Sequence, residues 1–338
     1  EGKYTMILVT GGLGFIGSHI ALSLLARGHE IVIVDNLANS TLQTLERLEY
    51  ISGMYIPFAK LDVRNTPALN KVFEQYSIDA VIHTASFKSL EESVLKPLEY
   101  YNDNVSCIMS LLRAMQRTGT RNFVHLSSLA VYGKSSLALD EQDEFNYQYP
   151  NPYIKSQQMI EHIIQDTCKT DSEWKVAILR VANVVGAFEH GVLGEFVTPL
   201  PKNIVPLAMQ VAAMQRDAIE LYQEANTEDG TVERGFVHVL DVCSAVQAAL
   251  YWLSNQQDSV CEAFNIAAEP YSIQELLNMI GKVAQAAIPT FAAQEGFQPL
   301  AQIGAHAEKA QKLLHWQAKK SLENMVVDEW RFYQQTLK

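Results

Sequence analysis

Positive charge is scarce in this chain of 338 residues, which has 26 Lys and Arg against 38 Asp and Glu and a net charge of −12. We find no basic patch of the kind that binding to nucleic acid requires. The four cysteines are scattered, without the CxxC or Cys/His spacing of a metal site, and suggest no disulfide framework. No run of about 18 apolar residues is present to form a membrane span. We therefore expect a cytoplasmic protein that binds no nucleic acid, no membrane and no metal.

Short apolar runs alternate with helical stretches through the first half of the chain. The runs lack polar alternation, which is typical of strands buried on both faces of a parallel sheet; they are Met6–Thr10, Ile31–Val34, Ala80–His83, Phe123–Ser127 and Val176–Leu179. The helical stretches between them are Gly17–Arg27, Thr41–Tyr50, Pro67–Gln75, Val94–Arg117 and Pro152–Cys168. Such repeated βα units predict the α/β class, with a Rossmann-type doubly wound parallel sheet.

This alternation ends near residue 181, and Gly and Pro become more frequent over 186–206. Phe236–Val242 is predicted to be a strand that returns to the first domain, and Ala245–Trp252 a short helix. We therefore expect one domain over 1–181, with a return segment near 236–262. A smaller C-terminal substrate-binding domain would span 182–338.

A glycine-rich loop follows the first predicted strand and opens the first helix. Gly11, Gly14 and Gly17 form a G-x-x-G-x-x-G pattern, in which glycines let the backbone approach a pyrophosphate resting on the helix N-terminus. Asp35 ends the second strand, 18 residues after Gly17. A carboxylate there binds both ribose hydroxyls and repels a 2′-phosphate, which favours NAD over NADP. The alternative is that Asp35 only caps a helix.

Longer motifs lead to a family. They are VTGGLGFIGSH at Val9–His19, VDNLANS at Val34–Ser40, VIH at Val81–His83, ESVLKPLEYY at Glu92–Tyr101, SSLAVYG at Ser127–Gly133, NPY at Asn151–Tyr153, VGA at Val185–Ala187, TEDGT at Thr227–Thr231 and HVLD at His238–Asp241. In these motifs the chain resembles the UDP-galactose (UDP-glucose) 4-epimerases of the extended short-chain dehydrogenase/reductase superfamily. The resemblance implies that NAD stays bound and takes hydride from C4 of a UDP-hexose. The 4-keto intermediate then turns, and hydride returns to its other face.

The resemblance also assigns residues to roles. Those that would contact NAD are Phe15, Ile16, Asp35, Asn36, Asn39, Ser40, Asp62, Val63, Lys88 and Tyr153, together with Asp103, which replaces an asparagine near the nicotinamide ribose. Ser128 and Tyr153 would face the sugar 4-hydroxyl, although a serine at a strand end is often only a local hydrogen-bonding group. The UDP part would be held by Asn183, Asn203, Ile204 and Arg234. A homodimer would form through the helices Val94–Arg117 and Pro152–Cys168.

The chain departs from the family pattern where the family carries charge. The family pairs its tyrosine with a lysine four residues later, which lowers the tyrosine pKa; here Gln157 follows Tyr153. Lys155 is two residues from Tyr153, about 200° around the helix, and should point away. A second phosphate-binding arginine is missing from Ala293–Phe297, and Gly235 replaces an aspartate beside Arg234.

Three hypotheses remain open from the sequence. The first is a slow or differently selective UDP-hexose 4-epimerase, in which Gln157 holds the ribose in place of lysine. The second is a catalytically impaired NAD-binding relative that acts as a sensor or scaffold. The third is another nucleotide-sugar enzyme, such as a dehydratase or decarboxylase; Leu129 and Ala130 after Ser128, where dehydratases usually carry an acidic pair, make it the least favoured. His83 and His238 are expected to serve packing or local hydrogen bonding.

Overall fold

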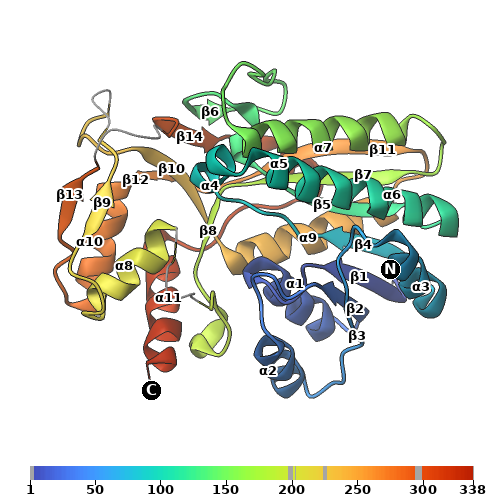
Figure 1. The fold of residues 1–338 in the computed structure, drawn as a ribbon, viewed down its shortest axis with the longest axis horizontal. Helices are drawn as coiled ribbons and strands as arrows, with labels where there is room; N and C mark the ends of the chain where they lie inside the picture. Colours follow the sequence, from blue (N-terminus) through green and yellow to red (C-terminus); the bar gives the residue numbers. More distant parts are fainter. Residues whose placement is uncertain (1–3, 197–200, 202, 224–226, 294–298, 338) are drawn as a thin grey trace.

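The centre of the molecule is a seven-stranded parallel sheet (Figure 1). The computed structural model describes residues 4–196, 201, 203–223, 227–293 and 299–337. The strands lie in the order β11-β7-β5-β4-β1-β2-β3. Their bounds are β1 Met6–Thr10, β2 Glu30–Asp35, β3 Phe58–Lys60, β4 Ala80–His83, β5 Asn122–Ser128, β7 Lys175–Val181 and β11 Val260–Ile266. The predicted doubly wound α/β fold is confirmed.

Helices cover both faces of this sheet (Figure 1). Those on one face are α3 Thr66–Tyr76, α6 Ser106–Thr118 and α7 Pro152–Cys168; those on the other are α1 Phe15–Ala26, α2 Leu42–Ser52 and α9 Val239–Ser254. Within β1, Leu8 belongs to the core under α3, α6 and α7, while Ile7 and Val9 belong to the core under α1, α2 and α9. Because both faces of the sheet are buried, the strand sequences are continuous apolar runs.

The predicted helical stretch Val94–Arg117 is helical in the structure, but it is interrupted at Lys96 and does not form one regular helix. The chain instead forms α4 Leu90–Leu95, α5 Pro97–Tyr100, a π-helical turn at Tyr101–Val105 and then α6. Pro97 causes the first break, because it lacks an N–H and forces Lys96 out of helical geometry, to φ −131° and ψ 56°.

The second region is built on a separate sheet of order β12-β10-β14-β6, with β8 paired to β10. The bounds are β6 Ser136–Leu139, β8 Asn183–Val185, β10 Glu233–His238, β12 Pro270–Ser272 and β14 Gln302–Ala305; β9 Ile219–Leu221 and β13 Thr290–Ala292 form a further pair. The helices are α8 Ile204–Ala212, α10 Ile273–Ala284 and α11 Leu322–Thr336, and short helical turns lie at Leu129–Tyr132, Glu189–Gly191 and Ala310–Leu314. This region has its own apolar core.

The predicted strand Phe236–Val242 is confirmed only as far as His238, and its expected return to the first domain is wrong. The strand β10 ends at His238 and belongs to the second sheet, and α9 starts at Val239. The His238 side chain accepts a hydrogen bond from the Leu240 N–H at 3.0 Å and so caps the N-terminus of α9. The chain therefore changes from strand to helix at this residue. The strand that returns to the seven-stranded sheet is β11. A short apolar run of this kind does not distinguish a strand from a buried helix.

Within the described ranges, no helix has the length and apolar character needed to cross a bilayer. No group of three or more His, Cys, Asp or Glu side chains in that part of the chain is placed to hold a metal ion.

Candidate cofactor and active site

The glycine loop brings the start of α1 close to the carboxyl ends of β1 and β4. Gly11 has φ +69°, and a Cβ on it would lie 2.8 Å from the Ala85 backbone nitrogen. A Cβ on Gly17 would lie 2.1 Å from the Gly11 carbonyl oxygen. Both positions therefore require glycine. Gly14 is the N-cap of α1 and brings no side-chain cap, so the helix N-terminus can offer its N–H groups to an anion.

Asp35 is fixed at the end of β2 beside this loop. Its carboxylate accepts hydrogen bonds from the Leu13 N–H at 3.1 Å, the Leu37 N–H at 2.9 Å and the Ser40 hydroxyl at 2.8 Å. The alternative interpretation of Asp35 as a helix cap is wrong, because the N-cap of α2 is Thr41. The carboxylate is instead a preorganised acceptor at the edge of the sheet where ligands of doubly wound folds bind.

A cavity of about 270 Å³ opens at this edge. Nine residues predicted to bind the cofactor line it: Gly11, Gly14, Asp35, Asn36, Asn39, Ser40, Asp62, Val63 and Asp103. Phe15, Ile16 and Gly17 form the first turn of α1, next to it. Lys88 and Tyr153 are not among its lining residues; the Lys88 ammonium lies 3.7 Å from the Glu195 carboxylate, which belongs to the second half of the chain. A cleft with a glycine floor and a carboxylate at the strand end fits a dinucleotide.

An arginine that none of the sequence motifs singled out joins two of the cavity's carboxylates. Arg64 forms ion pairs with both Asp62, at 2.6 Å, and Asp103. The hydrogen bonds from Arg64 lower the pKa of Asp62 to about 2. The negative charge of Asp103, which replaces the family asparagine, is balanced by the Arg64 guanidinium. The signal available in the sequence was the position of Arg64, directly after Asp62 and Val63.

Ser128 and Tyr153 come together from β5 and α7. Their hydroxyl groups lie close enough for Ser128 to affect the pKa of the phenol, and the Ser128 oxygen accepts from the Ala130 N–H at 3.2 Å. Tyr153 lies in the first turn of α7, whose N-cap is Asn151. Burial raises the pKa of Tyr153 to about 12, and the neighbouring Ser128 hydroxyl acts in the opposite direction. The geometry thus matches a serine–tyrosine pair, while the phenol holds its proton firmly.

Gln157 lies one helical turn after Tyr153 and is buried. Its Nε2 donates to the Ser86 hydroxyl at 3.3 Å. This contact carries no charge, so Gln157 cannot stabilise a phenolate as the ammonium of a lysine would.

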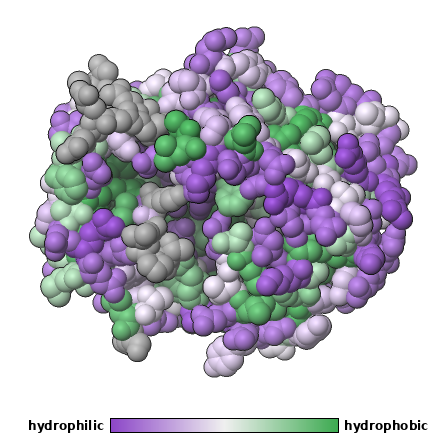
Figure 2. Space-filling model, viewed as in Figure 1, coloured by the Kyte–Doolittle hydropathy of each residue, from purple (hydrophilic) through white to green (hydrophobic). Residues whose placement is uncertain are grey.

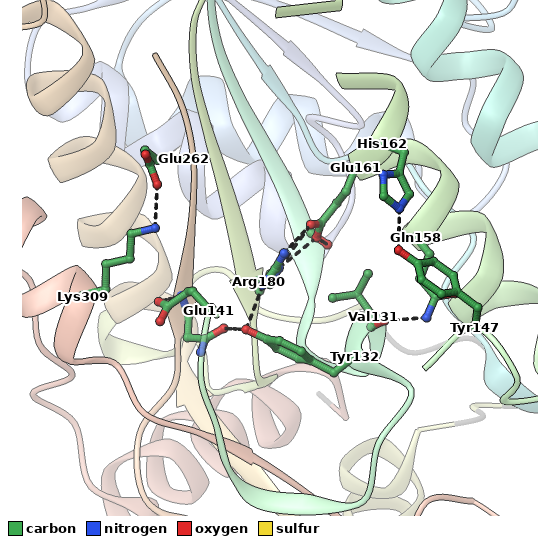
Figure 3. A network of polar contacts seen from close by, with 12 residues as sticks. Val131, Tyr132, Glu141, Tyr147, Gln158, Glu161, His162, Arg180, Glu262 and Lys309 are labelled. Carbon is green, nitrogen blue, oxygen red and sulfur yellow. Dashed lines mark hydrogen bonds and ion pairs between the residues drawn. The ribbon is translucent and has the colours of Figure 1, made fainter. Parts of the chain in front are cut away.

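A buried ion pair fixes α7 against the sheet (Figure 3). Arg180 on β7 lies 2.7 Å from the Glu161 carboxylate on α7, and both side chains are almost fully buried. Glu161 also accepts from the Ser127 hydroxyl at 2.6 Å, and Arg180 donates to the Tyr132 hydroxyl at 2.9 Å. Ser127 precedes Ser128 on β5, and Glu161 lies on the same helix as Tyr153. This network therefore fixes the position of Ser128 relative to Tyr153.

The four residues predicted to hold a UDP group all lie in the second region. Asn203 is the exposed N-cap of α8 and Ile204 its first residue. Asn183 is exposed at the start of β8, which pairs with β10 two residues beyond Arg234. The buried Arg234 guanidinium donates to the carbonyls of Glu233, Leu300 and Ala301 at 2.6–3.1 Å, and burial lowers its pKa to about 10. Of the stretch that lacks the second arginine, Gln294–Phe297 lies outside the described residues.

Both histidines have the local roles expected of them. His83 Nδ1 lies 2.6 Å from the Thr10 hydroxyl, and its ring stacks on that of His125. His238 caps α9 and lies 3.2 Å from the Asp328 carboxylate.

Comparison with known proteins decides the family. The model of the NAD dependent epimerase/dehydratase family matches residues 7–267. The chain belongs to this family. A curated relative, UDP-glucose 4-epimerase 2 of Arabidopsis thaliana, is 37% identical over 332 residues, which cover 96% of this chain and 94% of the relative. The resemblance inferred from the motifs is confirmed.

Solved structures of family members agree with this fold over its whole length. The UDP-glucose 4-epimerase of Bifidobacterium longum, in complex with NAD+ and UDP, superimposes with a TM-score of 0.94 at 32% identity, covering 98% of this chain and 99% of that one. The enzyme of Stenotrophomonas maltophila, with bound NAD and formylated UDP-arabinopyranose, gives 0.93 at 32% identity, covering 99% of each chain.

Proposed function

We propose that this protein is an NAD-dependent UDP-hexose 4-epimerase that interconverts UDP-glucose and UDP-galactose. The observation that carries the proposal is the Ser128–Tyr153 pair, which lies one turn of α7 from the residue that contacts the cavity-lining Ser86. The full-length relatives of this chain are UDP-glucose 4-epimerases. A sensor or scaffold without activity would not need two hydroxyl groups held together by a buried network.

NAD is the cofactor of this proposal, held by the residues that line the cavity and by the first turn of α1. Asp35 binds the ribose hydroxyls and disfavours a 2′-phosphate, and the α1 N-terminus receives the pyrophosphate. When bound, NAD supplies the hydride acceptor and a positive charge on its nicotinamide ring.

Tyr153 accepts the proton of the sugar 4-hydroxyl in the proposed reaction, and Ser128 donates a hydrogen bond to the same oxygen. The base is the phenolate, and a phenol with a pKa of about 12 forms little of it at neutral pH. Each pKa unit above 7 adds about 1.4 kcal/mol to the free energy of forming the phenolate. With the neutral Gln157 at the lysine position, we expect slow turnover.

The second region, which apart from β6 comes from 182–338, binds the UDP part of the substrate. Asn203 and Ile204 start α8, whose N-terminus favours an anion, and Arg234 brings a guanidinium to the neighbouring strand. With three donors engaged by carbonyl groups, Arg234 positions the strand segment as well as the substrate.

A coupled assay tests the function directly. UDP-galactose is supplied, and UDP-glucose formation is followed through UDP-glucose dehydrogenase. We expect turnover above background that disappears in Tyr153→Phe, which removes only the hydroxyl. A wild-type rate equal to that of Tyr153→Phe over several hours would rule the epimerase out.

A homodimer and a cytoplasmic location complete the proposal. Leu95 and Leu98 are 78% and 79% exposed, and Val94 and Met159 nearly half exposed. Green patches lie over α4 and α5 in Figure 2, on a face that is otherwise mainly hydrophilic. Such an apolar patch beside α7 is suited to pairing with its copy. All four cysteines are free thiols, which fits a reducing compartment. Light scattering measures the oligomeric state, and Leu95→Glu should yield a monomer.

A further inference from the structure

Ser86 connects Gln157 to the cofactor cavity. It follows β4 on the loop at the carboxyl end of the sheet, is exposed, and lines the cavity. Its hydroxyl accepts the hydrogen bond from Gln157 Nε2 at 3.3 Å. Gln157 is buried one helical turn from Tyr153, so this contact joins the cavity lining to the helix that carries Tyr153.

A buried asparagine fixes the loop that carries Ser86. Asn104 Oδ1 accepts from the Phe87 N–H at 2.9 Å and from the Ser86 hydroxyl at 3.2 Å. Asn104 Nδ2 donates to the Phe87 carbonyl at 3.1 Å and to the Ser156 hydroxyl on α7 at 3.2 Å. The loop, the π-helical turn and α7 are therefore joined by one set of hydrogen bonds, and the Ser86 oxygen has a defined position.

The hydrogen-bonding capacity of this pair matches a ribose hydroxyl. The Ser86 oxygen has two lone pairs, of which Gln157 uses one, and the Gln157 amide nitrogen carries a second N–H. Together they carry one further acceptor and one further donor at the part of the cavity that Ser86 lines. A hydroxyl donates one hydrogen and accepts others, so it satisfies both.

We propose that Ser86 and Gln157 act as one neutral pair that binds a ribose hydroxyl of NAD, which makes Ser86 a cofactor-binding residue. The inference rests on the proposed function for the identity of the cofactor. The pair supplies the ribose hydrogen bonds that a lysine would give, without the charge. Cofactor binding and the activation of Tyr153, which one lysine combines, are thereby separated in this chain.

The test is a double-mutant cycle on NAD affinity, measured by fluorescence titration of protein stripped of nucleotide. Ser86→Ala and Gln157→Met should each weaken NAD binding about five- to tenfold, the effect of one hydrogen bond. The double variant should bind NAD no more than about twofold more weakly than the single variant with the lower affinity, because the two side chains act as a unit. Ser86→Thr keeps the hydroxyl and should bind within about twofold of wild type. Ser52→Ala, at the end of α2 and outside the cavity, is the control, and urea unfolding checks that each variant is folded.

The proposal is overturned if Ser86→Ala binds NAD as wild type does, or if the two single effects multiply in the double variant. Epimerase turnover is measured in parallel. A coupled effect on NAD affinity without turnover in wild type would leave the Ser86–Gln157 pair standing and remove the epimerase. A wild-type protein that binds no NAD would remove both.

Discussion

Restoring the family lysine, as Gln157→Lys, is the perturbation that tests the electrostatic reasoning most directly. Gln157 and Tyr153 lie four residues apart on α7, and both are buried, at 2% and 7% exposure. Side chains at this spacing share one helix face with Cβ atoms about 5–6 Å apart. The ammonium would therefore lie on the side of α7 that carries the phenol.

The size of the effect follows from the separation of the two charges, taken as equal to that of the Cβ atoms. Two unit charges about 5.5 Å apart interact by about 3 kcal/mol at an effective dielectric constant of about 20, which corresponds to about 2 pKa units. The Tyr153 pKa, which burial raises to about 12, would fall toward about 10. Phenolate at neutral pH then becomes about a hundredfold more abundant. A phenolate of lower pKa is also a weaker base, so we expect kcat to rise between about tenfold and a hundredfold.

The assay is the coupled conversion of UDP-galactose, with kcat measured from pH 6 to 10. The matched control is Gln165→Lys, which makes the same chemical change on α7 two turns further from Tyr153. We expect the alkaline rise of kcat to shift to lower pH by about 2 units in Gln157→Lys and to stay in place in the control. If Gln157→Lys retains NAD but shows neither the shift nor a faster rate, the argument from charge is refuted.

Three further predictions concern the cofactor and the stability of the fold. Asp35→Asn should weaken NAD binding about tenfold and reduce the ratio of NAD affinity to NADP affinity, as measured by titration with both nucleotides. The same ratio in wild type and variant would contradict the role of the carboxylate. Burial lowers the pKa of His83 to about 4 and that of His125 well below 6.5. Each binds fewer protons folded than unfolded, so stability falls as pH drops from about 6.5 toward 4. His83 alone accounts for about 2 kcal/mol at pH 5, and urea unfolding of His125→Phe should show a weaker pH dependence. Arg180→Met should cost about 3–5 kcal/mol in urea unfolding because it leaves Glu161 charged and buried, and adding Glu161→Leu should restore much of that loss.

Much of the first half of the fold was predictable because its signals are local. A strand buried on both faces must be apolar throughout, so β1, β4 and β5 were visible in the sequence. The glycine loop was equally clear, because only glycine fits where a Cβ on Gly17 would meet the Gly11 carbonyl. Pro97 also carried a local signal for a helix break, but the helical pattern of the residues on either side of it is continuous and favoured a single helix.

The second half gave weaker signals because its pairings are distant in sequence. The strand β6 pairs with β14, more than 160 residues later, and no periodicity in either segment shows it. The apolar run at Phe236–Val242 fitted a strand or a helix equally well, and the cap at His238 decided where one ended and the other began.

The sequence by itself determined the sheet, the cofactor loop, the family and the loss of the lysine at Gln157, because each is written in neighbouring residues. Only the tertiary structure decided what surrounds these groups. It brought Arg64 to Asp103 and Ser86 to Gln157, and it enclosed Tyr153 so that its pKa rises. Hydrogen bonds and desolvation depend on distances between segments far apart in the chain, and only folding fixes those distances.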